Sequence, residues 1–120
     1  MIFANGTLYQ GVWKDDYFSG NGKIEYANGD IYNGNIINGK RTGYGRMFYK
    51  NGDNYDGYWK GDKRHGKGTL YFKNGDKYDG EWRNDKKHGK GAFYVGGKLS
   101  KRGVWENDEY SGKGILNKIF

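Results

Sequence analysis

The sequence predicts an all-β protein built as one elongated, single-layer, twisted antiparallel sheet. Three observations support this fold class: a repeat of 23 residues, an alternation of marked residues within each repeat, and 23 glycines with no proline among 120 residues. An alternation with a period of two is typical of strands, and glycine at this density disfavours helix. We therefore expect a meander of repeated β-hairpins with a solenoid-like organisation.

The repeat begins with tyrosine at positions 9, 32, 55 and 78, each 23 residues from the next. In the third unit, Tyr55 is followed by Gly57 and Trp59, then by the glycine pair Gly66 and Gly68. Asn-Gly-Asp recurs at 28–30, 51–53 and 74–76. Self-similarity at a fixed period identifies a repeat protein. We divide the chain, a single domain over residues 1–120, into a partial unit 1–8 and units 9–31, 32–54, 55–77, 78–100 and 101–120.

Each unit is predicted to supply two short antiparallel strands. In the unit 55–77 these lie near 55–59 and 67–73, joined by a glycine-containing loop of about six or seven residues. Asn-Gly between two alternating segments is a strong hairpin signal, so this turn leads into the next unit. About ten strands spaced by about 4.8 Å give a sheet roughly 50 Å long.

The core of such a sheet is predicted to be aromatic. Only 34% of the residues are hydrophobic, yet 18% are aromatic, which excludes a large aliphatic core. A ring can lie flat over a glycine in a neighbouring strand because no Cβ obstructs it, and each ring buries a large area. One unit cannot do this alone, so we expect neighbouring units to stabilise one another.

No constellation of residues predicts catalysis. The chain lacks cysteine, which excludes a thiol nucleophile and a thiolate metal site. Residues 61–67 are similar to a P-loop but lack the following Ser or Thr and lie within a hairpin. His65 and His88 stand one unit apart, about 10 Å, too far to share a zinc ion. The aspartates of the Asn-Gly-Asp turns are explained by turn structure. We expect a protein without enzymatic activity, cofactor or metal.

Positive charge is concentrated in the segments that follow the tryptophan position. The chain has a net charge of +7, and residues 37–46, 60–69 and 83–92 each carry +3. In a meander these segments project from one long edge, so they predict a basic stripe of Lys40, Arg41, Lys63, Arg64, Lys86 and Lys87. Two interpretations stay open: protection of the edge by charge, and binding of an acidic protein or an anionic phospholipid membrane.

Aromatic residues are also predicted on the second face of the sheet, because alternation directs them away from Trp59 and Trp82. Tyrosine is enriched at interfaces, so a row of exposed rings predicts a protein-binding surface; the alternative is that a twisted sheet covers these rings itself. The residues are Phe48, Tyr58, Tyr71 and Tyr94. Base stacking requires rings and basic residues together, and here they lie on different parts of the sheet. We therefore do not expect nucleic acid as a partner.

The pattern Tyr-x-Gly-x-Trp, followed by His-Gly-x-Gly and Asn-Gly at a spacing of 23, resembles the MORN repeat (membrane occupation and recognition nexus). Residues 55–68 and 78–91 carry it most clearly, whereas Ile36 replaces the tryptophan and Lys101 the tyrosine in other units. The resemblance implies a non-catalytic scaffold that binds protein partners in a larger assembly, with a ciliary or cytoskeletal complex as the expected setting. The alternative is a peripheral membrane module that binds anionic phospholipids.

The expected localisation is cytoplasmic. The N-terminus shows no secretory signal, and the lack of cysteine agrees with a reducing compartment. The resemblance adds the cytoskeleton, the ciliary axoneme or the membrane periphery. The sequence leaves open the identity of the partner, the oligomeric state, including a homo-oligomer, and whether a catalytic domain is attached.

Overall fold

The computed structural model describes residues 2–3, 5–11, 13–14 and 17–112. The last part of the unit 101–120, residues 113–120, lies outside the described residues. The strands in chain order are β1 (Leu8–Gln10), β2 (Trp13–Lys14), β3 (Tyr17–Phe18), β4 (Gly20–Glu25), β5 (Ile31–Ile37), β6 (Lys40–Phe48), β7 (Asn54–Lys60), β8 (Lys63–Tyr71), β9 (Lys77–Arg83), β10 (Lys86–Val95), β11 (Lys98–Glu106) and β12 (Glu109–Gly112).

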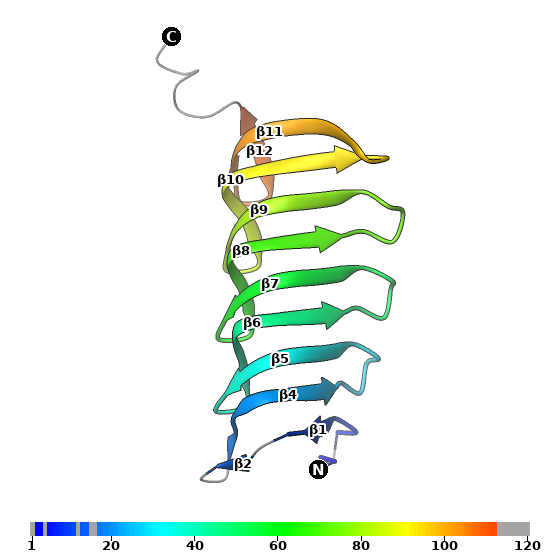
Figure 1. Ribbon diagram of the computed structural model, residues 1–120, viewed down its shortest axis with the longest axis vertical. Coiled ribbons are helices and arrows are strands. Elements are labelled where there is room, and N and C mark those ends of the chain that lie inside the picture. Colours follow the sequence, from blue (N-terminus) through cyan, green and yellow to red (C-terminus); the bar gives the residue numbers. More distant parts are fainter. Residues whose placement is uncertain (1, 4, 12, 15–16, 113–120) are drawn as a thin grey trace.

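The described strands confirm the predicted meander. Ten of them form one open antiparallel sheet in the order β1-β4-β5-β6-β7-β8-β9-β10-β11-β12, while β2 and β3 pair with each other (Figure 1). The molecule measures 55 × 29 × 19 Å, which agrees with the predicted length of the sheet. Among the described residues, no helix has the length and apolar character needed to cross a membrane.

The predicted six- or seven-residue loop within each unit is wrong. β7 and β8 are joined by a two-residue turn, Gly61-Asp62, whose φ angles of 53° and 72° are those of a type I′ hairpin turn. The turns Asn38-Gly39, Asn84-Asp85 and Asn107-Asp108 also have positive φ at both positions. The segment taken for a loop is strand, because its residues continue to pair with the neighbouring strands.

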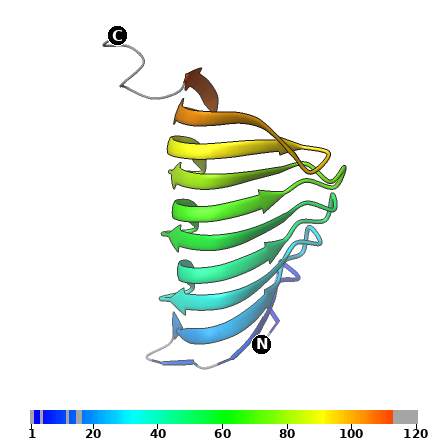
Figure 2. The ribbon, with the colours of Figure 1, turned by 45° about the horizontal axis from the view of Figure 1, so that its top comes forward.

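A bulge in each long hairpin explains why the local sequence looks like a loop. Gly57 pairs with Gly68 and Trp59 with Arg64, so that Tyr58 alone faces residues 65–67. Gly66, inside this bulge, has a φ of 82°, which side-chain-bearing residues rarely adopt. Similar register shifts interrupt the hairpins β5–β6 and β9–β10. Bulges bend a strand and increase its twist, and Figure 2 shows the resulting curved layer.

The bend creates an inner face on which the aromatic core lies. The rings of Tyr55 and Trp59 meet edge to face with centroids 5.0 Å apart, although residues four apart on a straight strand are about 13 Å apart. Tyr55 also meets Trp82 of the next unit at 5.4 Å. A continuous chain of edge-to-face contacts therefore runs along the array through Tyr32, Trp59, Tyr55, Trp82, Tyr78 and Trp105.

Packing of aromatic rings on glycine is confirmed. A Cβ at Gly68 would overlap the hydroxyl and ring of Tyr55, and Gly45 and Gly91 stand in the same relation to Tyr32 and Tyr78. The Tyr55 hydroxyl donates a hydrogen bond of 2.9 Å to the carbonyl of Tyr58. The indole Nε1 of Trp82 donates one of 3.0 Å to the carbonyl of Gly68. The second glycine of each pair thus accommodates one ring and anchors the next.

Candidate functional site: an aromatic outer face and an inner groove

Three of the four predicted protein-binding residues form a row on the outer face. Phe48 and Tyr71 both pair with Asn54, and Tyr71 and Tyr94 both pair with Lys77. Phe48 is 38% exposed and Tyr71 is 42% exposed. Tyr94 is only half-buried, and the ammonium of Lys77 lies 4.9 Å from the centroid of its ring. The row therefore alternates aromatic and polar side chains across β6 to β10.

The fourth predicted residue, Tyr58, lies apart from this row. It pairs with Tyr44 on β6, and the two rings meet edge to face at 5.6 Å. Tyr58 is 51% exposed and Tyr44 is 49% exposed. Tyr44 was not among the predicted residues, although it stands between Gly43 and Gly45, where alternation directs it to the same face as Phe48.

A polar network joins the tyrosine pair to the aromatic row. The Tyr44 hydroxyl donates to the carboxylate of Asp56, and Arg46 Nη2 donates to the same carboxylate over 2.7 Å. The guanidinium of Arg46 in turn lies 5.9 Å from the Phe48 ring centroid. Burial raises the pKa of Asp56, but the hydrogen bonds from Tyr44 and Arg46 outweigh it and lower that pKa below its usual value. Asp56 is therefore ionised at neutral pH and holds both partners in place.

The six predicted basic residues divide between two surfaces. Lys40, Lys63 and Lys86 begin β6, β8 and β10 and are exposed. The next residue in each strand is turned to the inner face, where it lies over a tryptophan: Arg41 at 4.7 Å from Trp59, Arg64 at 4.6 Å from Trp82, and Lys87 at 5.6 Å from Trp105. In β8, which begins at Lys63, residues 64, 66, 68 and 70 alternate onto one face. Arg64 therefore lies on the same face as Leu70, which the sequence prediction did not give because it began this strand at residue 67.

The inward cations fasten each hairpin turn to the preceding hairpin. The backbone N–H of Arg64 donates to Asp85 Oδ1 over 2.8 Å, and Arg64 Nη2 donates to the Asp85 carbonyl over 3.0 Å. The backbone N–H of Asp85 donates to the Arg64 carbonyl over 3.0 Å. Arg41 and Asp62 are joined in the same way. Lys87 binds Asp108 through backbone contacts, and burial lowers its pKa.

The Asn-Gly-Asp turns at the opposite edge have the structural role predicted for them. Asp53 receives a hydrogen bond from the backbone N–H of Lys73 in the next turn, at 2.8 Å. Its own N–H donates to Asn51 Oδ1 over 2.9 Å. Among the described residues, no three His, Asp or Glu side chains gather in a way that could hold a metal ion.

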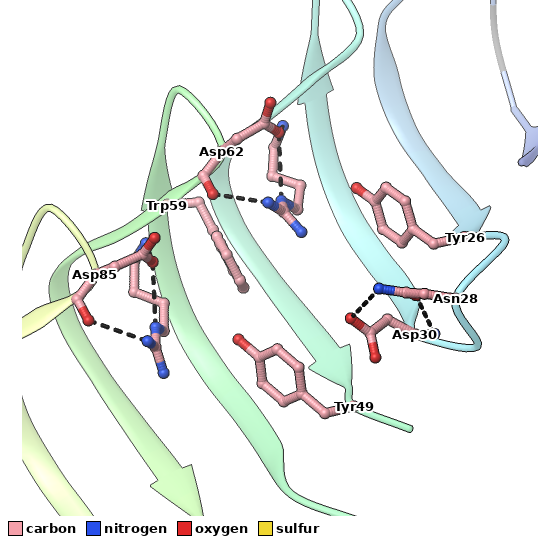
Figure 3. A pocket seen from close by; sticks show the side chains of 9 residues that line it. Tyr26, Asn28, Asp30, Tyr49, Trp59, Asp62 and Asp85 are labelled. Carbon is pink, nitrogen blue, oxygen red and sulfur yellow. Dashed lines mark hydrogen bonds and ion pairs between the residues drawn. The ribbon is translucent and has the colours of Figure 1, made fainter. Parts of the chain in front are cut away.

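Between the two edges the inner face is hollowed into a groove. A pocket of about 380 Å³ has Trp59 in its lining, Tyr26 and Tyr49 on the side of the Asn-Gly-Asp turns, and the pairs Arg41–Asp62 and Arg64–Asp85 on the other side (Figure 3). Burial raises the pKa of Tyr26 to about 12 and also raises that of Tyr49. The groove requires the bend at the bulges, so the sequence alone does not predict it.

The fold is a single layer of repeated hairpins that hydrogen-bond to one another. Its two faces carry different groups of side chains. These features define a repeat protein of the class that serves as an interaction module. The family model described as MORN repeat matches residues 9–31, 32–54, 55–77, 78–97 and 102–116. The chain therefore belongs to the MORN repeat family. MORN repeats are non-enzymatic and generally interact with proteins or membranes. A comparison with curated proteins finds no match.

Proposed function

We propose that this array is a non-catalytic scaffold that binds a protein partner through its outer face. The observation that carries the proposal is the exposure of large aromatic side chains in the middle of the array. Tyr44, Phe48, Tyr58 and Tyr71 are between 38% and 51% exposed and share one face. Scattered exposed apolar residues need no explanation, but a contiguous group marks an interaction site.

The chemistry of this face suits a protein interface. Tyrosine offers a large apolar ring together with a hydroxyl, and both it and arginine are enriched at interfaces. The Tyr44–Asp56–Arg46 network holds the side chains in place before a partner arrives, which reduces the entropy lost on binding. By the family resemblance, the proposed setting is a larger ciliary or cytoskeletal assembly.

The test compares partner capture by variants of the full chain. The first variant carries serine at the five outer aromatic positions, Tyr44, Phe48, Tyr58, Tyr71 and Tyr94. The control variant carries Lys50→Gln, Lys73→Gln and Lys98→Gln, which change three exposed lysines outside the proposed surface. Partners that bind the wild type and the control should be lost from the serine variant, while its circular dichroism spectrum shows that it is still folded at the temperature of the assay. If a folded serine variant captures the same partners, the outer face is not the binding site.

A second candidate function, binding to an anionic membrane, is supported by the exposed cations at the hairpin tips. Because Arg41, Arg64 and Lys87 are engaged on the inner face, this surface consists of Lys40, Lys60, Lys63, Arg83 and Lys86, all of which are exposed. A basic residue near an anionic membrane surface contributes about 1 kcal/mol. The proposed lipid surface therefore keeps three of the six residues of the predicted stripe and adds Lys60 and Arg83.

Vesicles of phosphatidylcholine with phosphatidylserine test this second candidate. Lys40→Gln, Lys63→Gln and Lys86→Gln together should lower binding roughly 100-fold, since about 3 kcal/mol is removed. The control is again Lys50→Gln, Lys73→Gln and Lys98→Gln, which removes the same charge elsewhere. Binding should also weaken at high ionic strength. An equal loss in both variants would show attraction by net charge, without a defined surface.

A further inference from the structure

Two tyrosines of the outer face are in direct contact on neighbouring strands. Tyr44 of β6 pairs with Tyr58 of β7, and the two ring centroids are 5.6 Å apart with an interplanar angle of 75°. Both side chains are half exposed, so an oxidant in solution can reach both rings. Among the tyrosines whose side chains the structure describes, this is the one pair whose two rings meet edge to face.

The repeat itself does not require this pair. The residues that face each other at the same position in other units share neither size nor charge: Asn21 with Asn35, Lys67 with Glu81, and Lys90 with Val104. All of these units nevertheless form the same sheet. The fold therefore tolerates many side chains where Tyr44 and Tyr58 stand, and two phenols side by side are a property of this position alone.

The two rings are well placed to be joined. The Cβ atoms of directly opposite residues on antiparallel strands are about 4.5–5.5 Å apart, and exposed side chains rotate within nanoseconds. Such rotation can bring the ring carbons next to the two hydroxyls into van der Waals contact, at about 3.5–4.0 Å. On the other side of Tyr58 stands Gly66, at which an added Cβ would lie 3.5 Å from the Tyr58 Cβ. The glycine therefore leaves the Tyr58 ring room to turn.

Asp56 supplies a base beside one of the phenols. A phenol that loses an electron becomes a strong acid and must release its proton. The Tyr44 hydroxyl already donates a hydrogen bond to the Asp56 carboxylate, so the proton can move along an existing bond. The guanidinium of Arg46, 2.7 Å from the same carboxylate, favours its ionised form, and the Asp56 side chain is 20% exposed, so it can pass the proton on to water. Tyr44 is therefore the phenol that is oxidised more readily.

We propose that Tyr44 and Tyr58 form a site of oxidative modification, at which a haem peroxidase acting with hydrogen peroxide joins the two rings as dityrosine. Each phenol loses one electron and its hydroxyl proton, and a carbon–carbon bond forms between the two ring carbons next to the hydroxyls. The hydrogens on these carbons then leave as protons while the oxygens regain protons, which restores both phenols. In total the pair gives up two electrons and two protons, which reduce hydrogen peroxide to two molecules of water.

The test treats the full chain, at low concentration, with a haem peroxidase and hydrogen peroxide. Dityrosine is detected by its fluorescence, and peptide mapping identifies the joined residues. Intact mass distinguishes a link within one chain, which removes two hydrogen atoms, from a link between two chains. The wild type should give a monomer in which Tyr44 is joined to Tyr58. Tyr44→Phe and Tyr58→Phe should each abolish this product, whereas the control Tyr71→Phe, which removes an exposed hydroxyl from the same face, should retain it.

A second pair of variants tests the base. Asp56→Asn keeps the size of the side chain but cannot accept the proton, so the initial rate of cross-linking should fall several-fold. Asp79→Asn changes the equivalent position of the next unit and should react like the wild type. Circular dichroism establishes that each variant is folded. A wild-type rate in Asp56→Asn would overturn the role assigned to Asp56.

The proposal as a whole is overturned if the wild type forms no dityrosine within one chain, if the link joins other tyrosines, or if Tyr44→Phe retains the product. The reaction takes place in the chain without a partner. It therefore does not depend on the function proposed for the outer face, and the two proposals can fail separately.

Discussion

The Tyr55 ring occupies the space in which a side chain at Gly68 would begin. Tyr55 is fully buried, and its hydroxyl is fixed by the hydrogen bond to the Tyr58 carbonyl. The ring therefore cannot move aside, and the glycine is required by the tyrosine of the neighbouring strand. The same relation joins Tyr32 to Gly45 and Tyr78 to Gly91, so it is repeated along the array.

Substitution of Gly68 by alanine should destabilise the array although alanine is a small residue. The new Cβ collides with a fixed ring, and overpacking of this kind costs about 1–3 kcal/mol or more. Urea denaturation followed by tryptophan fluorescence measures the change. The matched control is Gly61→Asn, because a Cβ added at Gly61 would meet no atom within 4 Å. The positive φ of this turn position suits asparagine, which holds it in the other hairpins as Asn38, Asn84 and Asn107. Equal stability of Gly68→Ala and the wild type would contradict aromatic-on-glycine packing.

Removal of a core tryptophan should cost far more than removal of an outer aromatic residue. Trp82 is 4% exposed and contacts both Tyr55 and Tyr78, so Trp82→Ala should lower the free energy of unfolding by roughly 3–5 kcal/mol. Tyr71→Ala, on the exposed face of β8, should lower it by no more than about 1 kcal/mol. Chemical denaturation of both variants gives the comparison. Similar losses at the two positions would mean that the inner face is not the core.

The contact between Arg64 and Asp85 should matter mainly through the backbone. Asp85→Gly tolerates the positive φ of this position and leaves the N–H of Arg64 without its acceptor, and an unsatisfied donor costs about 1–3 kcal/mol. The Arg64–Asp85 ion pair is partly exposed and contributes little to the free energy of unfolding. High salt, which screens the ion pair, should therefore not lower the stability of the wild type as much as the substitution does. Asp79→Ala, which removes an exposed hydrogen bond to Thr69, is the control. Thermal unfolding at low and high ionic strength distinguishes the two contributions; if salt alone weakens the wild type as much, the charges dominate.

The array should lose stability as the pH rises above about 10. Burial raises the pKa of Tyr32, Tyr55 and Tyr78 well above the ordinary value of 10.0, and that of Tyr26 to about 12. In the unfolded chain these phenols release protons near pH 10 while the folded chain retains them, so stability is complete below that pH and falls above it. Lys87, whose pKa burial lowers, acts in the opposite direction, but it is a single group, whereas the pKa of Tyr49 is raised in addition to those of the four tyrosines named above.

The measurement is the denaturation midpoint at a series of pH values from 8 to about 11. Tyr78→Phe should show a shallower decline, because one of the responsible phenols is gone, although the variant also lacks the hydrogen bond to Glu81. A midpoint that stays constant, or rises, over this range would show that the buried tyrosines do not control alkaline unfolding.

The sequence by itself was sufficient to predict the meander and the face of most side chains. The period of 23 aligns equivalent residues, and an alternation of two assigns Tyr55, Trp59 and Leu70 to one face and Tyr58 and Tyr71 to the other. These features depend on backbone geometry that is local and the same in every unit. For the same reason, aromatic packing on glycine can be predicted from the sequence alone.

Only the tertiary structure decided where the strands bend and what the bend brings together. The bulge at residues 65–67 is a pattern of cross-strand pairing, and a glycine-rich segment that pairs in this way looks in the sequence like an open loop. Once the bend is formed, Arg64 is carried over Trp82 and away from the basic edge, and the Arg41 guanidinium lies between Trp59, at 4.7 Å, and Tyr26, at 5.4 Å. The register of hydrogen bonds between strands decides which residues of different strands meet on the inner face. The spacing of residues along the chain does not specify that register.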